Sequence, residues 1–197
     1  MSNDKSKEGL GYWRVGLQYF HLVKSVVNEA IRQGNTFVVI MPEEFSWDVY
    51  EQKTKWSDHN LIVPVLFDFY HALEVVFKGF LIASGETISM NHKLSELLSG
   101  FESHFPKHTI GSIARKYILP GQLSPILTSF CAESGISIDQ YYQALKYPES
   151  TSGRVYQHDP LMNHGESGLP FLKELAADID QIVAATVRLG KSLCEVA

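Results

Sequence analysis

Residues Trp56–Leu98 decide the fold of this chain: WSDHNLIVPVLFDFYHALEVVFKGFLIASGETISMNHKLSELL. The run from Ile62 to Ala83 is strongly apolar, and at about 100° per residue its large side chains fall on one helical face. Four polar residues occupy a separate sector of the same helix. The pattern predicts a long helix that lies deep in a bundle and keeps one polar strip. The residues of that strip are Asp68, His71, Glu74 and Lys78.

A membrane span is the alternative for this segment, because the segment is long enough to cross a bilayer. Its charged residues argue against that alternative, since each charge at the centre of a bilayer costs about 2.5–3.5 kcal/mol on insertion scales. We therefore expect a core helix in a protein that does not enter a membrane.

Hydrophobic periodicity on both sides of this helix predicts further helices. A disordered N-terminus is expected over residues 1–10, followed by a long amphipathic helix over Gly11–Gln33. The last helix is expected to run from Pro170 almost to the C-terminus. Shorter helices are predicted over Lys93–Phe105, Ile110–Tyr117, Ser124–Glu133 and Tyr141–Leu145.

Two segments lack a helical period. Residues 35–60 predict an irregular insertion, in which Phe37–Met41 favours an extended piece and Glu44–Trp56 includes a short helix. The second segment, Tyr147–Gly168, is rich in Pro, Gly, Ser and His, which predicts a loop with a short hairpin around Ser152–Gly153.

The composition is that of a folded protein, with 197 residues, 45% hydrophobic and 20% charged. With the periodic segments, it predicts a mainly α, up-and-down helical bundle with an irregular insertion between the first two long helices, in one domain over residues 11–197. The net charge of −5 gives no general attraction for nucleic acid. The polar N-terminus and the two cysteines, Cys131 and Cys194, favour a cytoplasmic protein with reduced thiols.

Several motifs resemble the HEPN superfamily of helical bundle proteins. The likeness covers about Trp56–Pro148: a proline-led apolar helix, a Glu and a Lys four residues apart, a glycine, a His-x-Leu start of the next helix, and a later Ala-Leu-Lys-Tyr-Pro. The matching residues are Pro64, Glu74, Lys78, Gly85, His92, Leu94 and Ala144–Pro148. The resemblance implies an up-and-down helical bundle, frequent homodimers and, in many members, metal-independent RNase activity.

The catalytic signature of that superfamily is an Arg and a His with four to six residues between them, usually on a late helix. Arg154 and His158 have only three residues between them and lie in the predicted loop. Arg14 and His21 have six, but on the first predicted helix, where seven positions are about two turns and both side chains face one way. The Arg would stabilise developing phosphate charge while the His transfers a proton. The alternative is a solvated polar stripe, which also includes Gln18, Ser25, Asn28 and Arg32.

The polar strip of the apolar helix is a candidate binding site. Glu74 and Lys78 have the spacing of an i,i+4 ion pair, and Asp68 with His71 would make an acid/base or metal pair. The alternative is a structural strip that packs against the polar stripe of the first helix.

A second candidate binding site is a small basic patch of Arg115, Lys116 and Lys146 with tyrosines nearby. Aromatic rings beside cations often hold single-stranded RNA. The alternative is half-buried packing of the tyrosines. These are Tyr117, Tyr141, Tyr142 and Tyr147.

The remaining histidines occur as the pairs His104/His108 and His158/His164. A zinc site needs three or four ligands with supporting geometry. We therefore expect no metal and no cofactor.

The sequence thus favours a HEPN-like helical protein that is non-catalytic or catalytically degenerate and binds RNA, a nucleotide or a protein partner as a homodimer. One alternative is an active metal-independent endoribonuclease that uses Arg14 and His21. The other is a helical domain with a purely structural or protein-interaction role.

Overall fold

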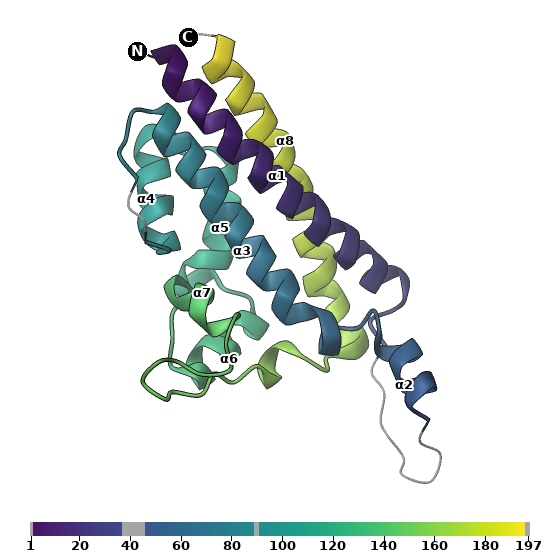
Figure 1. Cartoon of the computed structure of the whole chain (residues 1–197). Coiled ribbons are helices and arrows are strands. Elements are labelled where there is room, and N and C mark those ends of the chain that lie inside the picture. The colour runs from purple at the N-terminus through teal and green to yellow at the C-terminus, as the bar shows by residue number, and fades with distance from the viewer. Residues whose placement is uncertain (1, 37–45, 89–90, 196–197) are drawn as a thin grey trace.

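The computed structural model describes residues 2–36, 46–88 and 91–195, and within these ranges the chain is mainly helical (Figure 1). Eight α-helices occur there, and the β contact in these ranges is an isolated bridge between Glu149 and Val155. The prediction of a mainly α helical bundle is confirmed. The extended piece predicted over residues 37–41 lies outside the described residues.

Three long helices form the body of the molecule: α1 (Ser2–Arg32), α3 (Asp58–Ala83) and α8 (Leu169–Glu195). α1 packs along both α3 and α8, and both run antiparallel to it, so the two chain ends lie together (Figure 1). The three helices assemble because each carries an apolar stripe with a helical period. Phe20, Leu73 and Ile179, one from each helix, are completely buried.

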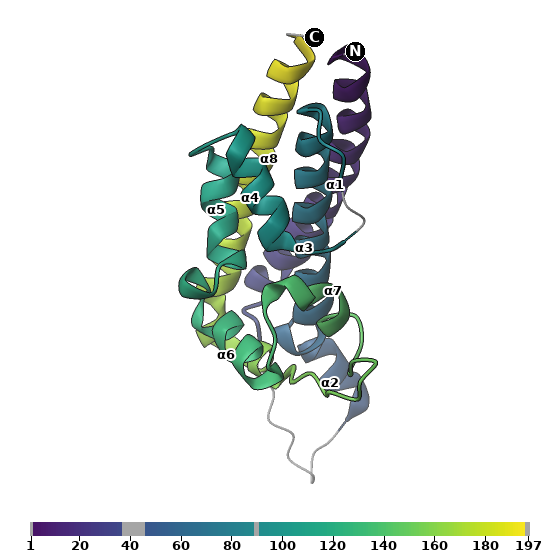
Figure 2. The same ribbon diagram turned by 90° about the vertical axis from the view of Figure 1, so that its left-hand side faces the viewer.

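Shorter helices cover the side of α3 that faces away from α1 (Figure 2). α4 packs on α3, and α5 packs on both α4 and α8. Phe101 of α4 contacts Phe77 of α3, with ring centroids 5.2 Å apart. α7 also contacts α3, and α6 packs near the lower end of the bundle. Their bounds are α4 (Leu94–His104), α5 (Thr109–Ile118), α6 (Pro125–Ser134) and α7 (Tyr141–Ala144).

Capping residues and a glycine mark the ends of the shorter helices. The Ser124 side chain accepts a hydrogen bond at the start of α6, and Gly135 ends that helix with φ at 63°, a conformation that favours glycine. Ser137 forms a capping box with Gln140 just before α7. The predicted hairpin is confirmed by the bridge at Glu149 and Val155, which enclose the turn.

The disordered N-terminus predicted over residues 1–10 is wrong from Ser2 onward, because α1 begins there. Ser6 is buried and donates a hydrogen bond to the backbone of α8. Gly9 packs against α3, where a Cβ at this position would lie 2.7 Å from the carbonyl oxygen of Gly79. Contacts with α3 and α8, rather than local propensity, therefore extend the helix.

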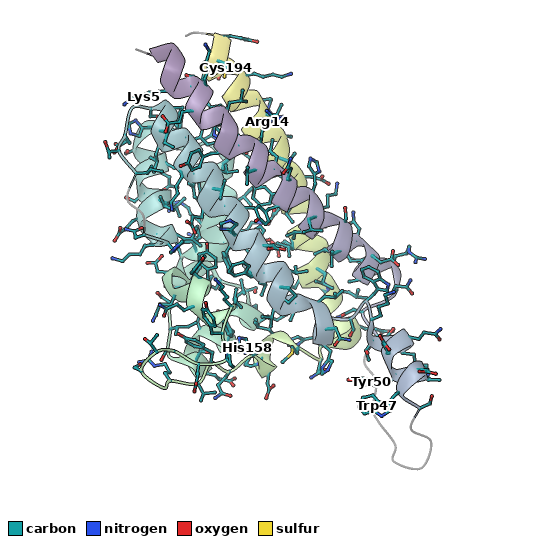
Figure 3. All side chains as sticks on the ribbon, in the orientation of Figure 1. Lys5, Arg14, Trp47, Tyr50, His158 and Cys194 are labelled. Atoms are coloured by element: carbon teal, nitrogen blue, oxygen red, sulfur yellow. The ribbon has the colours of Figure 1, made fainter. Side chains whose placement is uncertain are left out.

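The insertion between the first two long helices contains α2 (Trp47–Thr54), so the short helix predicted within Glu44–Trp56 is confirmed. α2 lies beyond the end of the three long helices (Figure 1), and Figure 3 marks Trp47 and Tyr50 on it. The Tyr50 hydroxyl lies 3.1 Å from Nε2 of His59 at the start of α3. Trp47 is 73% exposed.

By length and composition, α3 is long and apolar enough to cross a membrane, and no other helix in the described ranges meets that description. More than half of its most apolar stretch is buried inside the bundle by its neighbours. Such burial is typical of a core helix.

Candidate functional site

Glu74 is buried where α3, α7 and the segment leading into α4 meet. Three donors converge on its carboxylate. Lys78 Nζ lies 2.7 Å from Oε1, and His92 Nδ1 lies 2.9 and 3.0 Å from the two oxygens. The hydroxyl of Tyr141 donates to Oε2. Glu74, Lys78 and His92 therefore form one network, which Tyr141 of α7 completes.

The carboxylate of Glu74 is ionised at neutral pH. Burial raises its pKa, but hydrogen bonds from Lys78, Tyr141 and His92 outweigh burial and hold the pKa below its usual range. Lys78 is 8% exposed, so the two charges compensate each other inside the protein. Removing one partner of such a pair leaves the other charge buried and uncompensated. The network therefore fixes how α7 docks on α3.

Aromatic rings lie directly over this network. The His92 ring stacks on Tyr142, with centroids 3.8 Å apart and an interplanar angle of 7°. Lys146 Nζ lies 5.0 Å from the centroid of Tyr142 and 5.4 Å from that of Tyr147. A cation at these distances from two ring centroids is attracted by both π-systems. We call this arrangement the ladder. Its members, in order, are His92, Tyr142, Lys146 and Tyr147.

The ring contacts continue from Tyr142 onto α3 and α1. Phe67 lies 5.8 Å from Tyr142 and nearly parallel to His71, with centroids 6.1 Å apart in the second pair. His71 meets Tyr19 of α1 edge to face at 4.8 Å. Each of these rings is half-buried, so one side of it reaches solvent. We call this surface the aromatic strip. It consists of Tyr19, Phe67, His71, His92, Tyr142, Lys146 and Tyr147.

His71 and Asp68 are the polar members of α3 at the strip. Burial lowers the pKa of His71, and the charges of Glu74 and Asp68 oppose that effect only in part, so the ring is neutral at pH 7. Its Nδ1 is buried and has no hydrogen-bond partner among the described residues. The pKa of Asp68 is raised by burial, with His71 acting in the opposite direction. The predicted strip of α3 is thus divided, with Glu74 and Lys78 beneath the surface and Asp68 and His71 at it.

A cavity of about 330 Å³ continues the aromatic strip beyond Tyr147. Tyr147 is 50% exposed and forms one of its walls. The other walls come from α7, through Gln143, and from the start of the hairpin loop, through Pro148, Glu149, Ser150 and Thr151. A ligand stacked on Tyr147 would therefore lie next to this cavity.

The predicted patch of Arg115, Lys116 and Lys146 does not form. Arg115 makes two hydrogen bonds to Glu102 of α4, at 2.7 and 2.6 Å. Lys116 is held by carboxylates of α8, including Asp178 at 2.9 Å. Both cations are partly exposed and paired with carboxylates of neighbouring helices, and Lys146 alone of the three joins the aromatic strip. Tyr117 and Tyr141, predicted to stack beside the patch, are buried.

The polar stripes of α1 and α3, which were expected to pack together as the structural alternative, do not meet. Arg14 and His21 are exposed on the outer face of α1, and Figure 3 marks Arg14 there. Neither side chain makes a hydrogen bond to a described residue. The residue of α1 that contacts the α3 strip is Tyr19. Within one chain, the described surroundings therefore hold neither Arg14 nor His21 in a fixed catalytic geometry.

The other histidines have structural partners. His158 Nε2 lies 2.6 Å from the carbonyl oxygen of Ala144, and His104 pairs with Glu86 at 2.9 Å. Arg154 donates to the carbonyl oxygen of Gly135 at 2.7 Å. No group of three or more His, Cys, Asp or Glu in the described part of the chain has the geometry of a metal site.

Sequence reasoning missed two members of the aromatic strip, Tyr19 and Phe67, because both resemble ordinary core residues of amphipathic helices. His92 was noted as part of a motif but not as a site residue, and only its contacts with Glu74 and Tyr142 give it a role. Comparison with known proteins found no matching family, no matching curated protein and no matching solved structure.

Proposed function

We propose that this chain is a HEPN-like helical protein that binds single-stranded RNA, or nucleotides with the same chemistry, at the aromatic strip, and that it is not a nuclease. The observation that carries the proposal is the ladder in which Lys146 lies over both Tyr142 and Tyr147 while His92 stacks on Tyr142. Solvent-accessible rings next to a cation are what single-stranded nucleic acid binders use for bases and phosphates.

The energetics favour stacking over long-range attraction. The chain carries a net charge of −5, which does not draw polyanions toward it. Base stacking on an aromatic side chain contributes about 1–3 kcal/mol per base. Lys146 supplies one phosphate contact. For one such contact to a single strand, the logarithm of the binding constant falls with the logarithm of the salt concentration with a slope of about −0.7. Binding at the strip should therefore depend only weakly on salt.

The test is fluorescence anisotropy with a labelled, mixed-sequence single-stranded RNA, measured with Tyr147→Ala and Lys146→Gln. Both side chains are exposed, so neither change should unfold the protein. We expect Tyr147→Ala to weaken binding at least about fivefold, and Lys146→Gln to flatten the salt dependence. Trp47→Ala is the matched control, because it removes an exposed aromatic ring on α2, away from the strip (Figure 3).

Competition with a mononucleotide shows whether the aromatic strip binds free nucleotides or single-stranded RNA. A free nucleotide that displaces the RNA at comparable concentration would identify a nucleotide site, whereas weak competition would identify a strand site. RNA binding that Tyr147→Ala and Lys146→Gln leave unchanged would remove the proposal and favour the protein-interaction alternative.

A further inference from the structure

The contact between Glu74 and His92 decides which nitrogen of the imidazole carries its proton. Glu74 is ionised and has only acceptor atoms, so the nitrogen that faces it must donate. That nitrogen is His92 Nδ1, which lies 2.9 and 3.0 Å from the carboxylate oxygens. A neutral imidazole has one N–H. His92 Nε2 is therefore an acceptor when the ring is neutral.

The stacking contact decides where that acceptor points. The His92 ring lies flat on Tyr142, so Nε2 lies in the plane of the ring and at the edge of the stack. The side chain is 39% exposed, and Nε2 makes no hydrogen bond to a residue in the described ranges. Glu74 thus holds the ring from one edge and leaves the opposite edge open to a ligand.

Resting on the proposed function, we infer that His92 Nε2 accepts a hydrogen bond from a ribose 2′-hydroxyl, so that the aromatic strip binds RNA in preference to DNA, with Glu74 as the positioning residue. A base stacked on the ladder lies in a parallel plane, and its in-plane donors point away from Nε2. Phosphate oxygens accept hydrogen bonds and do not donate at neutral pH. The 2′-hydroxyl is the donor at the edge of a stacked nucleotide, and DNA lacks it.

The first test compares three single strands of one sequence: RNA, DNA and 2′-O-methyl RNA. Binding is measured by anisotropy near pH 8. The methylated strand keeps the 2′ oxygen and loses its proton. We expect RNA to bind about fivefold more tightly than either of the other two, the effect of one hydrogen bond. Equal affinity for RNA and methylated RNA would overturn the inference.

His92→Phe is the matched variant, because it keeps a ring against Tyr142 and removes both nitrogens. Its RNA affinity should fall to the level of its DNA affinity, while DNA affinity changes little. His92 is part-exposed, so this variant should fold. Lys191→Gln, an exposed change on α8, should leave the preference for RNA unchanged.

The positioning role of Glu74 has its own readout. ¹⁵N NMR of the imidazole in the unaltered protein should show a bare Nε2 and a protonated Nδ1. In Glu74→Gln the amide can donate to Nδ1, which should move the proton to Nε2 and abolish the preference for RNA. A ring protonated at Nε2 in the unaltered protein would contradict the inference, whether or not the Glu74 variant folds.

These outcomes separate the inference from the proposed function. If RNA and DNA bind equally and Tyr147→Ala weakens both, the aromatic strip remains a nucleic-acid site and the role of His92 is withdrawn. If neither strand binds, the proposed function fails and the inference fails with it.

Discussion

At the scale of single residues, the buried charge of Glu74 leads to a specific prediction about stability. Glu74→Ala would leave Lys78 buried and unpaired and would remove the acceptor of Tyr141. Breaking a buried pair in this way costs about 3–5 kcal/mol. Lys107→Ala, on an exposed turn, should change stability by less than about 0.5 kcal/mol. Urea unfolding of the two variants checks the contrast, and equal midpoints would refute the role given to Glu74.

The same residue sets a pH dependence. The pKa of Glu74 is lowered in the folded protein relative to its ordinary value of 4.5. The folded state therefore binds this proton less tightly than the unfolded state. The resulting stabilisation is fully present above about pH 4.5 and is lost as the pH falls through the lower, folded-state pKa. Thermal melting between pH 7 and pH 3 should show a steeper decline for the unaltered protein than for Glu74→Gln. Parallel curves would show that Glu74 does not contribute.

The prediction about catalysis concerns Arg14 and His21. A proton-transfer group must come within about 2.6–3.2 Å of its target, and the cation must be fixed beside it. Both side chains are exposed and no described residue orients them. We expect weak or no cleavage of a labelled mixed-sequence RNA in single-turnover assays with chelator present. Robust cleavage that His21→Ala abolishes would promote the endoribonuclease alternative, whereas cleavage that persists in this variant would point to another site or a contaminant.

At the scale of elements, the close crossing of α1 and α3 depends on glycine at position 9, which has no side chain. A Cβ at Gly9 would lie 2.7 Å from the carbonyl oxygen of Gly79, a backbone atom that cannot move aside easily. Gly9→Ala should force the helices apart and destabilise the protein by about 1–3 kcal/mol. Gly11→Ala is the matched control, because a Cβ there meets nothing within 4 Å. On the same helix it should stabilise by about 0.5–1 kcal/mol. Chemical denaturation should show a lower free energy of unfolding for Gly9→Ala and a higher one for Gly11→Ala. Changes of the same sign in both variants would contradict the close approach of α1 and α3.

At the scale of the whole molecule, we expect a homodimer at micromolar concentration, formed through α1 and α8. The apolar stripes of these helices are largely used inside the monomer, but Leu10, Val15, Leu22 and Val187 remain exposed. Light scattering should give twice the chain mass of 22.2 kDa. Val187→Glu on α8 should reduce that mass, and Val155→Glu on the hairpin, also exposed, should not. A monomer mass over the whole concentration range would refute the expectation.

Much of the fold could be predicted because its signals are local. Leu175, Ile179 and Ile182 mark a helical period that needs no partner to be recognised, and Gly135 and Ser124 mark the ends of α6. The start of α1 could not be predicted, because Ser2–Leu10 is polar and becomes helical through packing of Ser6 and Gly9 on other helices.

The sequence by itself determined the helices, the burial of α3 and the presence of an unusual polar strip on it, because side-chain periodicity is a property of the chain alone. Only the tertiary structure decided what that strip does. In the folded protein, Glu74 accepts hydrogen bonds from Tyr141 and His92. Arg115 and Lys116 pair with carboxylates of α4 and α8 instead of joining Lys146. The physical reason is that a hydrogen bond or ring contact is set by distances between residues far apart in sequence. The network joins positions 74, 92 and 141, and nothing in the spacing of those residues shows that they meet.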